Sequence, residues 1–240
     1  MSVEPGVHMR WHDLAFLHWP VDADVMRSRV PRELEVDTFD GRAWVGLVPF
    51  EMCDCRFRGV PQLESTERFY ECNVRTYVRH NGRAGVWFFS LDAETWLPVL
   101  GARLLWSLPY FKASFDVKHG ADRTAYSMRR RSKDHRDASE IVWHKGATLP
   151  RSRPGSIEHF LTERYYLFAR RMGRIYRGRI AHVPWTLREA RVETWRDGLV
   201  RAAGLDAIGE PIALCSDDIE VRGWSLVESA AAPEADGSDA

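Results

Sequence analysis

The sequence predicts an α+β fold made mainly of antiparallel strands, curled into a β-barrel or barrel-like sheet, with two or three helices. Three observations predict it: many runs of aromatic and β-branched residues, turn dipeptides between these runs, and few stretches with helical spacing. A chain of 240 residues can bury roughly 70–75% of its unfolded surface. No repeat and no Gly/Ser/Pro-rich linker divides it. We therefore expect one barrel domain over residues 1–228 and a disordered acidic tail over residues 229–240.

The strongest strand signal is a β-hairpin at Asn81-Gly82. Residues 67–80 and 83–93 are both rich in β-formers, and only this pair separates them. Asn-Gly accepts the positive φ angles of a type I′ turn, so the two runs are expected to pair. Residues 42–57 follow an Asp40-Gly41 turn and predict another long strand. Further strands are expected near residues 110–118, 123–132, 138–145, 163–171, 174–182, 186–195 and 219–227.

Helical signals are few. Asp22 is a suitable N-cap for a short helix that runs to Arg29. Thr95 can cap a longer one that runs to Leu108, because apolar residues recur there at helical spacing before a proline. A third helix is expected over 156–162.

Charge and hydropathy favour a soluble cytoplasmic protein. Thirty-four basic residues balance thirty-four acidic ones, so the net charge favours neither nucleic acid nor an anionic membrane as a partner. No apolar run approaches the roughly 18 residues of a membrane span, and the first residues lack the order of a signal peptide. The arginine-rich stretches 129–136 and 169–179 are interpreted as solvated strand faces. Exposed sheet edges leave room for a homo-oligomer.

No pattern indicates a metal or an organic cofactor. The histidines near the start lack an HExxH spacing, and the cysteines lack a second CxxC or CxH pair. GxSxG, P-loop and GxGxxG motifs are also absent from the sequence. We expect a cofactor-free protein with hydrogen-bonded strand histidines and free, buried thiols. The residues concerned are His8, His12, His18, Cys53, Cys55, Cys72 and Cys215.

The most informative segment is residues 67–80. Strand alternation places one set of mainly polar side chains on a single face: Glu71, Asn73, Arg75 and Tyr77. This face either meets solvent or forms the polar wall of a pocket inside the barrel. In a pocket, Arg75 would bind a substrate carboxylate in a fork, and Glu71 would serve as an acid or base.

A second segment begins after Pro109. Tyr110 and Lys112 alternate there with Phe111 and Ala113, which leaves Lys112 on the polar face of the strand. A lysine attacks a carbonyl only when its amine is neutral, which requires desolvation or a neighbouring like charge. Lys112 is therefore either a surface lysine or, if it faces inward, an imine-forming one. We place two further residues near the pocket opening, Tyr110 and Arg103, and His18 close to the pocket.

The ordered phrases WHDLAFLHWPVD, VPRELEVDTFDGRAWVGLVPF, YECNVRTYV, GVWFFSLDA and ARLLWSLPYFKA resemble the YqjF-like family, domain of unknown function 2071, over residues 9–227. That family is distantly similar to acetoacetate decarboxylase. The resemblance implies a curled antiparallel barrel around a small-molecule cavity. In the decarboxylase, a lysine shortly after a proline forms an imine with a β-keto acid. Here Tyr110 or Phe111 stands in that place, with Lys112 displaced, and Glu71 is similar to the decarboxylase's acidic pocket residue.

These observations predict a pocket for a small carboxylated or carbonyl-bearing molecule. One hypothesis is a cofactor-free lyase or acid/base enzyme, in which Glu71 shuttles a proton and Arg75 or Tyr77 stabilises an enolate or carboxylate. If Lys112 faces inward, imine-based decarboxylation or aldol-type chemistry becomes available. Another hypothesis is a non-catalytic ligand-binding or sensing protein with the same pocket. A third is a barrel filled by the ten tryptophans, without a cavity.

Overall fold

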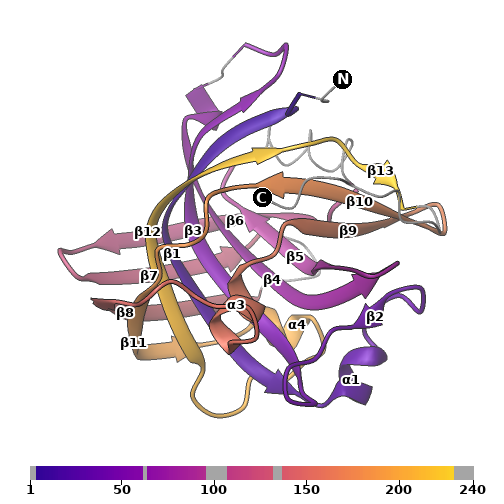
Figure 1. Cartoon of the computed structure of the whole chain (residues 1–240). Coiled ribbons are helices and arrows are strands. Elements are labelled where there is room, and N and C mark those ends of the chain that lie inside the picture. The colour runs from indigo at the N-terminus through magenta and orange to yellow at the C-terminus, as the bar shows by residue number, and fades with distance from the viewer. Residues whose placement is uncertain (1–3, 62–63, 96–106, 132–136, 230–240) are drawn as a thin grey trace.

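The computed structural model describes residues 4–61, 64–95, 107–131 and 137–229. Thirteen strands of this part of the chain form one curled, mixed sheet, and three short α-helices and a 3-10 turn lie at its rims (Figure 1). The strands are β1 Val7–Val21, β2 Glu35–Val36, β3 Ala43–Phe57, β4 Arg68–His80, β5 Arg83–Ala93, β6 Tyr110–His119, β7 Arg123–Arg130, β8 Ala138–Thr148, β9 Tyr166–Arg171, β10 Arg174–Ala181, β11 Arg188–Arg196, β12 Ile212–Gly223 and β13 Val227–Glu228. The helices are α1 Ala23–Arg27, α3 Ile157–Thr162 and α4 Leu199–Ala202, and the 3-10 turn is η1 Glu64–Thr66.

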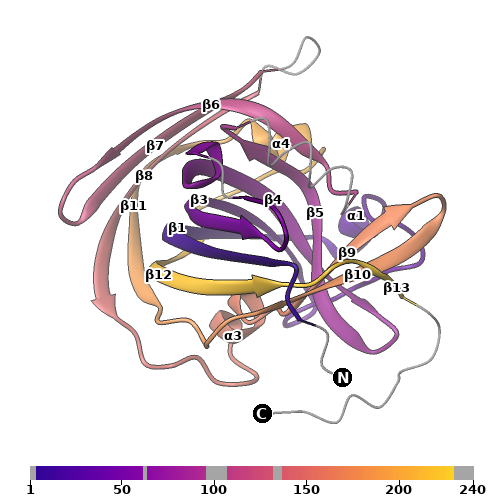
Figure 2. The same ribbon diagram turned by 90° about the horizontal axis from the view of Figure 1, so that it is seen from above.

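The sheet closes on itself twice. Its strand order is β13-β10-β9-β5-β6-β7-β8-β11-β12-β1-β3-β4-β2, with additional pairings of β10 with β12 and of β5 with β4. These pairings define a first circuit through β10, β9, β5, β4, β3, β1 and β12. A second circuit runs through β5, β6, β7, β8, β11 and β12 and returns through β1, β3 and β4. Figure 2 shows β1, β3 and β4 between the two, with β6, β7, β8 and β11 on one side and β9 and β10 on the other.

Most of the strand pairs are antiparallel, which confirms the predicted fold class. Two pairings are parallel, those of β5 with β6 and of β5 with β9. Parallel neighbours need a crossover connection instead of a tight turn, and long segments separate β5 from both partners. These two parallel pairings of β5, together with the pairings of β10 with β12 and of β5 with β4, give the sheet its two circuits.

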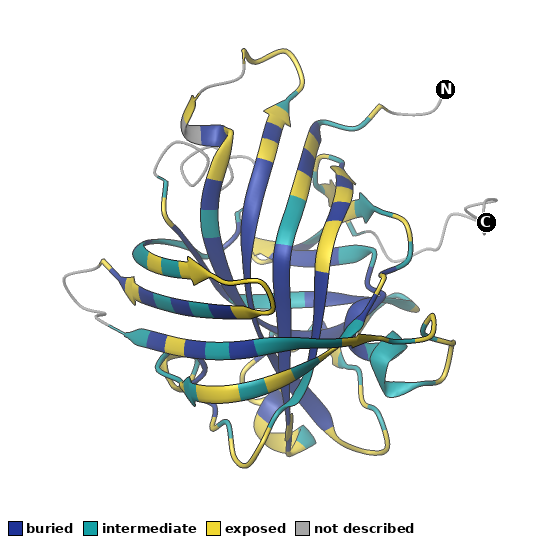
Figure 3. Cartoon of the chain, turned by 90° about the vertical axis from the view of Figure 1, so that its left-hand side faces the viewer, coloured by how far each residue is buried: buried dark blue, intermediate teal, exposed yellow. Residues whose placement is uncertain are grey.

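The strands shared by both circuits are buried on both faces. Residues 43–53 of β3 and residues 71–78 of β4 are all buried, whereas β7, at the outside, alternates between buried and less buried positions (Figure 3). A strand with packed elements on each side loses the polar-out alternation of a surface strand. For this reason, the polar residues of β4 do not face solvent.

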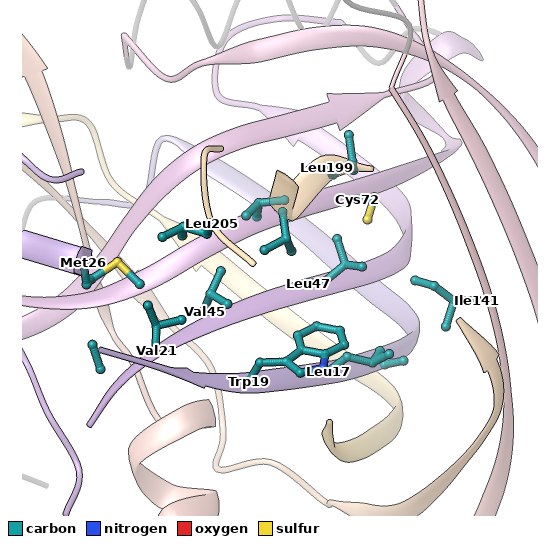
Figure 4. Close-up of a cluster of buried hydrophobic side chains, with 14 of the residues drawn as sticks. Leu17, Trp19, Val21, Met26, Val45, Leu47, Cys72, Ile141, Leu199 and Leu205 are labelled. Carbon is teal, nitrogen blue, oxygen red and sulfur yellow. The ribbon is translucent and has the colours of Figure 1, made fainter. Parts of the chain in front are cut away.

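Hydrophobic side chains fill the second circuit. A large cluster packs there, with contributions from shared strands, outer strands and the helices α1 and α4 (Figure 4). Trp19 and Trp143 are its largest members, and both are fully buried. The hypothesis of a barrel filled by tryptophans, without a cavity, is therefore wrong, because the first circuit holds a cavity.

A buried carboxylate, Asp13, ties the outer strands to β1. It lies where the β1–β3 pairing is interrupted, at a positive φ of 49°. Its carboxylate accepts a hydrogen bond from Thr124 Oγ1 at 2.8 Å and lies 2.7 Å from His119 Nδ1 and from Lys145 Nζ. These contacts join β1 to β6, β7 and β8.

The predicted hairpin is present. Asn81 and Gly82 have φ angles of 50° and 77°, as a type I′ turn requires, and they connect β4 to β5. Asp22 caps α1 by accepting from the amides of Asp24 and Val25, and Ser156 caps α3. Much of the helix expected over 95–108 falls on residues 96–106, outside the described part of the chain.

Several elements were not anticipated in full, and β2, η1 and α4 were not predicted at all. β1 was expected only through its histidines, and β12 begins at Ile212, earlier than the predicted start at 219. No helix in the described ranges is long and apolar enough to cross a membrane.

Candidate functional site

A cavity of about 80 Å³ lies within the first circuit. At the 10–15 Å³ that one ordered water needs, it has room for about six waters, or a small metabolite. Apolar side chains from β1, β3, β5, β9 and β10, together with Leu108 and Trp185, make most of its wall. Its polar lining residues are Glu71, Asn73, Arg75, Tyr110, Thr162, Arg164, Tyr166 and His182.

Glu71 is 3% exposed and contributes a neutral carboxyl group to this wall. Burial raises its pKa to about 8, with a smaller contribution in the same direction from Asp92. A hydrogen bond from Tyr110 opposes the shift. Its Oε2 atom has no hydrogen-bond partner. At neutral pH, Glu71 therefore offers a proton to the cavity rather than a negative charge.

Arg75 contributes a positive charge from the same strand. It is 8% exposed, its Nη2 donates to the carbonyl of Leu161 at 3.2 Å, and its guanidinium lies 5.6 Å from the ring centre of Phe16. No carboxylate within the described ranges forms a salt bridge with it, and its Nε has no hydrogen-bond partner. A buried cation without an anionic partner is costly, so the site is complementary to an anion.

Asn73 lies between these two on β4, and its Oδ1 atom is also buried without a hydrogen-bond partner. Buried polar atoms are normally hydrogen-bonded, and unpartnered ones lining a cavity are characteristic of ligand-binding sites. The structure thus gathers Glu71, Asn73, Arg75 and Tyr110 around one cavity.

His18 and Tyr77 are not among the residues that line the cavity. His18 Nε2 is 2.6 Å from the Tyr77 hydroxyl, which donates its single proton to the Leu161 carbonyl at 2.7 Å. The hydroxyl must therefore accept from His18, so Nε2 carries the proton and Nδ1 is an unpartnered acceptor. Burial, and secondarily Arg75, lowers the pKa of His18 well below its ordinary value. Tyr77 thus holds the end of α3, and His18 holds the Tyr77 hydroxyl in place.

Gly46 on β3 makes room for the His18 ring. A Cβ at this position would lie 2.8 Å from His18 Nε2. We expect Gly46→Ala to displace the imidazole and to lower the free energy of unfolding by about 1–3 kcal/mol, as overpacking usually does. Urea denaturation measures this. If the clash with His18 causes this loss, the double variant His18→Ala with Gly46→Ala will lose less free energy of unfolding than the two single variants lose together. Additive costs would contradict it.

Sequence reasoning missed several lining residues after α3. Arg164 lines the cavity, but its Nη1 is 2.6 Å from Asp37 Oδ2, so its charge is paired. Tyr166 and His182 come from β9 and from the end of β10. These residues carry no motif or alternation of their own, because the additional pairing of β10 with β12 brings them to the cavity. No local pattern could have found them.

Lys112 is not among the residues that line the cavity. β5 pairs with β6 only as far as Ala93 and Lys112, and from Ala113 onward β6 pairs with β7. Lys112 therefore lies where the pairing of β6 changes from β5 to β7, two residues beyond Tyr110. No lysine in the described part of the chain lines the cavity. Arg103 lies outside the described residues.

No cluster of three or more His, Cys, Asp or Glu side chains suited to a metal occurs within the described ranges. All four cysteines are free and buried. Burial raises the pKa of the Cys55 thiol to about 12, with a smaller contribution from Glu71. These thiols are therefore protonated and unreactive at neutral pH.

Comparison with known proteins agrees with this architecture. A family described as an uncharacterized conserved protein, DUF2071, matches residues 8–220. The uncharacterized protein YqjF of Bacillus subtilis (strain 168) is 36% identical over 231 residues, which cover 94% of this chain and 95% of that protein.

Solved structures with a similar fold include a biosynthetic enzyme and acetoacetate decarboxylase-like enzymes. The enduracididine biosynthesis enzyme MppR complexed with pyruvate has a TM-score of 0.65 and 14% identity, covering 96% of this chain and 92% of that one. An acetoacetate decarboxylase-like enzyme from Sphingomonas wittichii RW1 has a TM-score of 0.66 and 12% identity, covering 95% and 94%. At such identities the likeness concerns the fold alone. By sequence, the chain belongs to the DUF2071 family, and its fold is similar to that of acetoacetate decarboxylase-like enzymes.

Proposed function

We propose that the cavity binds a small oxo acid, a molecule with a carboxylate and a carbonyl group, and that Arg75 holds the carboxylate. The buried Arg75 guanidinium, which has no salt-bridge partner in the described part of the chain, carries this proposal. A ligand carboxylate would compensate its charge and accept from its unpartnered Nε.

Glu71 supplies the acid. With its pKa near 8, its carboxyl is protonated at neutral pH and can donate to a carbonyl oxygen of the ligand. A proton donated there stabilises the enol or enolate that forms when an adjacent C–H or C–C bond breaks. Asn73, between the two groups on β4, adds a further hydrogen-bonding side chain to the wall. The reaction class is acid/base catalysis on an oxo acid without a covalent imine.

Two observations support this class. One is that no lysine in the described ranges lines the cavity, so an imine has no amine to form on there. The other is the ligand of a structural neighbour. MppR was solved in complex with pyruvate, which carries both a carboxylate and a carbonyl group. A cavity of about 80 Å³ suits a molecule of that kind.

We expect Arg75→Met to weaken the binding of oxo acids by about 100-fold, because the buried ligand carboxylate loses its charged partner. Titration calorimetry with pyruvate, acetoacetate and levulinate measures this and also reports the preferred distance between carboxylate and carbonyl. Arg171→Met, at an exposed position on β9, is the matched control and should bind as the unchanged protein does. An affinity that survives Arg75→Met would contradict the proposal, as would the absence of binding for all three acids.

Glu71→Gln distinguishes an enzyme from a ligand-binding protein. If the protein consumes an oxo acid, the Gln variant should lose turnover and retain most of its binding, because the amide preserves the shape and removes the acidic proton. If the acids bind but are not transformed, the protein is a ligand-binding or sensing protein. NMR spectra of the acids over time separate the two.

A further inference from the structure

His182 lies between the cavity and a groove that is open to solvent. The groove has a volume of about 550 Å³ and is formed by β1, β3, β12 and residues 181–183. Met9 and His182 line both the groove and the cavity. His182 can therefore contact a ligand on one side and exchange protons with solvent on the other.

The ring of His182 is fixed in orientation and in tautomer. Nδ1 is 2.7 Å from the carbonyl oxygen of Val183. A carbonyl only accepts hydrogen bonds, so Nδ1 carries the proton and Nε2 keeps its lone pair in the neutral ring. Tyr165 stacks on the ring at 4.8 Å between centroids, and Trp185 packs against it at 5.1 Å. This arrangement, an imidazole held by a hydrogen bond through one nitrogen, is typical of a general base.

The surroundings keep this imidazole neutral. Burial lowers the pKa of His182 below its ordinary value, the Val183 carbonyl and Glu163 oppose the shift, and Arg75 adds to it. On the groove side the charged and titratable residues are His8, Arg10, Asp54, Arg56, Glu220 and Arg222. There, Arg10 lies 3.1 Å from Glu220 and Arg56 lies 3.6 Å from Asp54, so these charges are largely balanced.

We propose that His182 is the general base of the site and removes a proton from the carbon next to the carbonyl of a bound oxo acid. This inference rests on the proposed function, because it requires the oxo acid to be bound through Arg75. In the step, Nε2 takes the α-proton and the C–H electron pair forms a carbon–carbon double bond. The carbonyl π pair moves to oxygen, which takes the proton of Glu71. The products are an enol, an imidazolium and a carboxylate, and the reverse step restores all three groups.

The environments of Glu71 and His182 support their roles as acid and base. They shift the two pKa values in opposite directions, upward for the carboxyl of Glu71 and downward for the imidazole of His182. A protonated acid and a neutral base then coexist at neutral pH in one cavity, which is the arrangement that enolisation requires. Because His182 also lines the open groove, the proton it takes can exchange with solvent before the reverse step.

Exchange of the α-protons of pyruvate for deuterium tests this directly. In D2O, proton NMR follows the loss of the methyl signal with the full-length protein, with His182→Asn and with His182→Gln. We expect catalysed exchange with the unchanged protein and at least a 100-fold slower rate with either variant, while the calorimetric Kd for pyruvate changes by less than about threefold. His182→Asn keeps an N–H near the position of Nδ1, so it also guards against loss of the local fold. His144→Gln, on β8 in the second circuit, is the matched control.

The outcomes separate this inference from the proposed function. Pyruvate binding without exchange would overturn the role of His182 and leave oxo-acid binding intact. Exchange that persists in folded His182→Asn and His182→Gln would assign the base to another residue. Failure of pyruvate, acetoacetate and levulinate all to bind would overturn the proposed function and this inference together. Loss of exchange with retained binding and a retained melting temperature would support both.

Discussion

Replacing Glu71 by glutamine is expected to leave stability almost unchanged at pH 5 and to make the protein markedly more stable than the unchanged chain at pH 9. The reason is the cost of a buried negative charge. Glu71 is fully enclosed, and burial raises its pKa from 4.5 to about 8. Glutamine has a similar shape and no proton to lose, so its stability does not depend on this ionisation.

The direction follows from proton binding in the two states. Between pH 4.5 and about 8, the folded protein keeps the Glu71 proton and the unfolded chain releases it. The contribution of Glu71 to the free energy of unfolding is fully present below pH 4.5. It is lost as the pH rises through the pKa of Glu71 in the folded protein, which is about 8. The loss is at most about 1.4 kcal/mol per pH unit. The difference between the variant and the unchanged protein should therefore grow with pH and level off above pH 8, at about 4–5 kcal/mol.

Denaturant unfolding at pH 5, 7 and 9 measures this difference. Glu220→Gln, an exposed carboxylate on β12, removes the same charge without burial and serves as the control. Parallel stability curves for Glu71→Gln and the unchanged protein across this range would show that Glu71 is ionised in the folded state. That result would also remove the acid from the proposed reaction.

Much of the sheet could be predicted from local sequence. β3, β4 and β5 were expected almost to the residue, because Asp40-Gly41 and Asn81-Gly82 mark their ends and β-formers fill the runs between. The closure into two circuits could not be predicted. It depends on the pairing of β10 with β12 and on the parallel pairings of β5 with β6 and with β9. The residues that pair β10 with β12 are about 40 positions apart in the chain.

The site was predictable to the extent that one strand builds it. Alternation along β4 identified Glu71, Asn73 and Arg75 as neighbours on one face, but it allowed that face to meet solvent. Only the topology shows that β4 is shared by two circuits and buried on both faces. Tyr77 was placed on the same wall, yet its hydroxyl donates to the Leu161 carbonyl of α3 and the side chain does not line the cavity. His182 gave no local signal, because its position depends on distant pairing.

A second large effect is expected at the buried ion pair of Asp92 and Arg130. Asp92 is fully buried on β5 and Arg130 is 5% exposed on β7, and two hydrogen bonds of 2.7 and 2.8 Å join them. The guanidinium also lies 4.0 Å from the ring centre of Phe111. The pair connects β5 and β7, the two strands that flank β6, near the point where the pairing of β6 changes from one to the other.

Desolvation outweighs attraction in this pair. Burial raises the pKa of Asp92 above its ordinary value, and the hydrogen bond and charge of Arg130 offset the shift only in part. Removing one partner leaves the other charge buried alone, so Arg130→Met should lower the free energy of unfolding by about 3–5 kcal/mol. Replacing both residues, as Asp92→Leu with Arg130→Met, should recover most of this loss, because neither member of the pair then leaves a buried charge without its partner.

The exposed pair of Arg123 and Glu193 provides the comparison. It has a similar bidentate geometry, at 3.0 and 3.1 Å, but both side chains are at least 40% exposed. Solvent already screens these charges, so Arg123→Met should change stability little. If the double change at Asp92 and Arg130 proved as destabilising as Arg130→Met alone, the pair itself would hold the circuits together. A double variant close to the unchanged protein would instead show that apolar packing around β6 suffices, and that the ion pair selects the register of β7 rather than supplying stability.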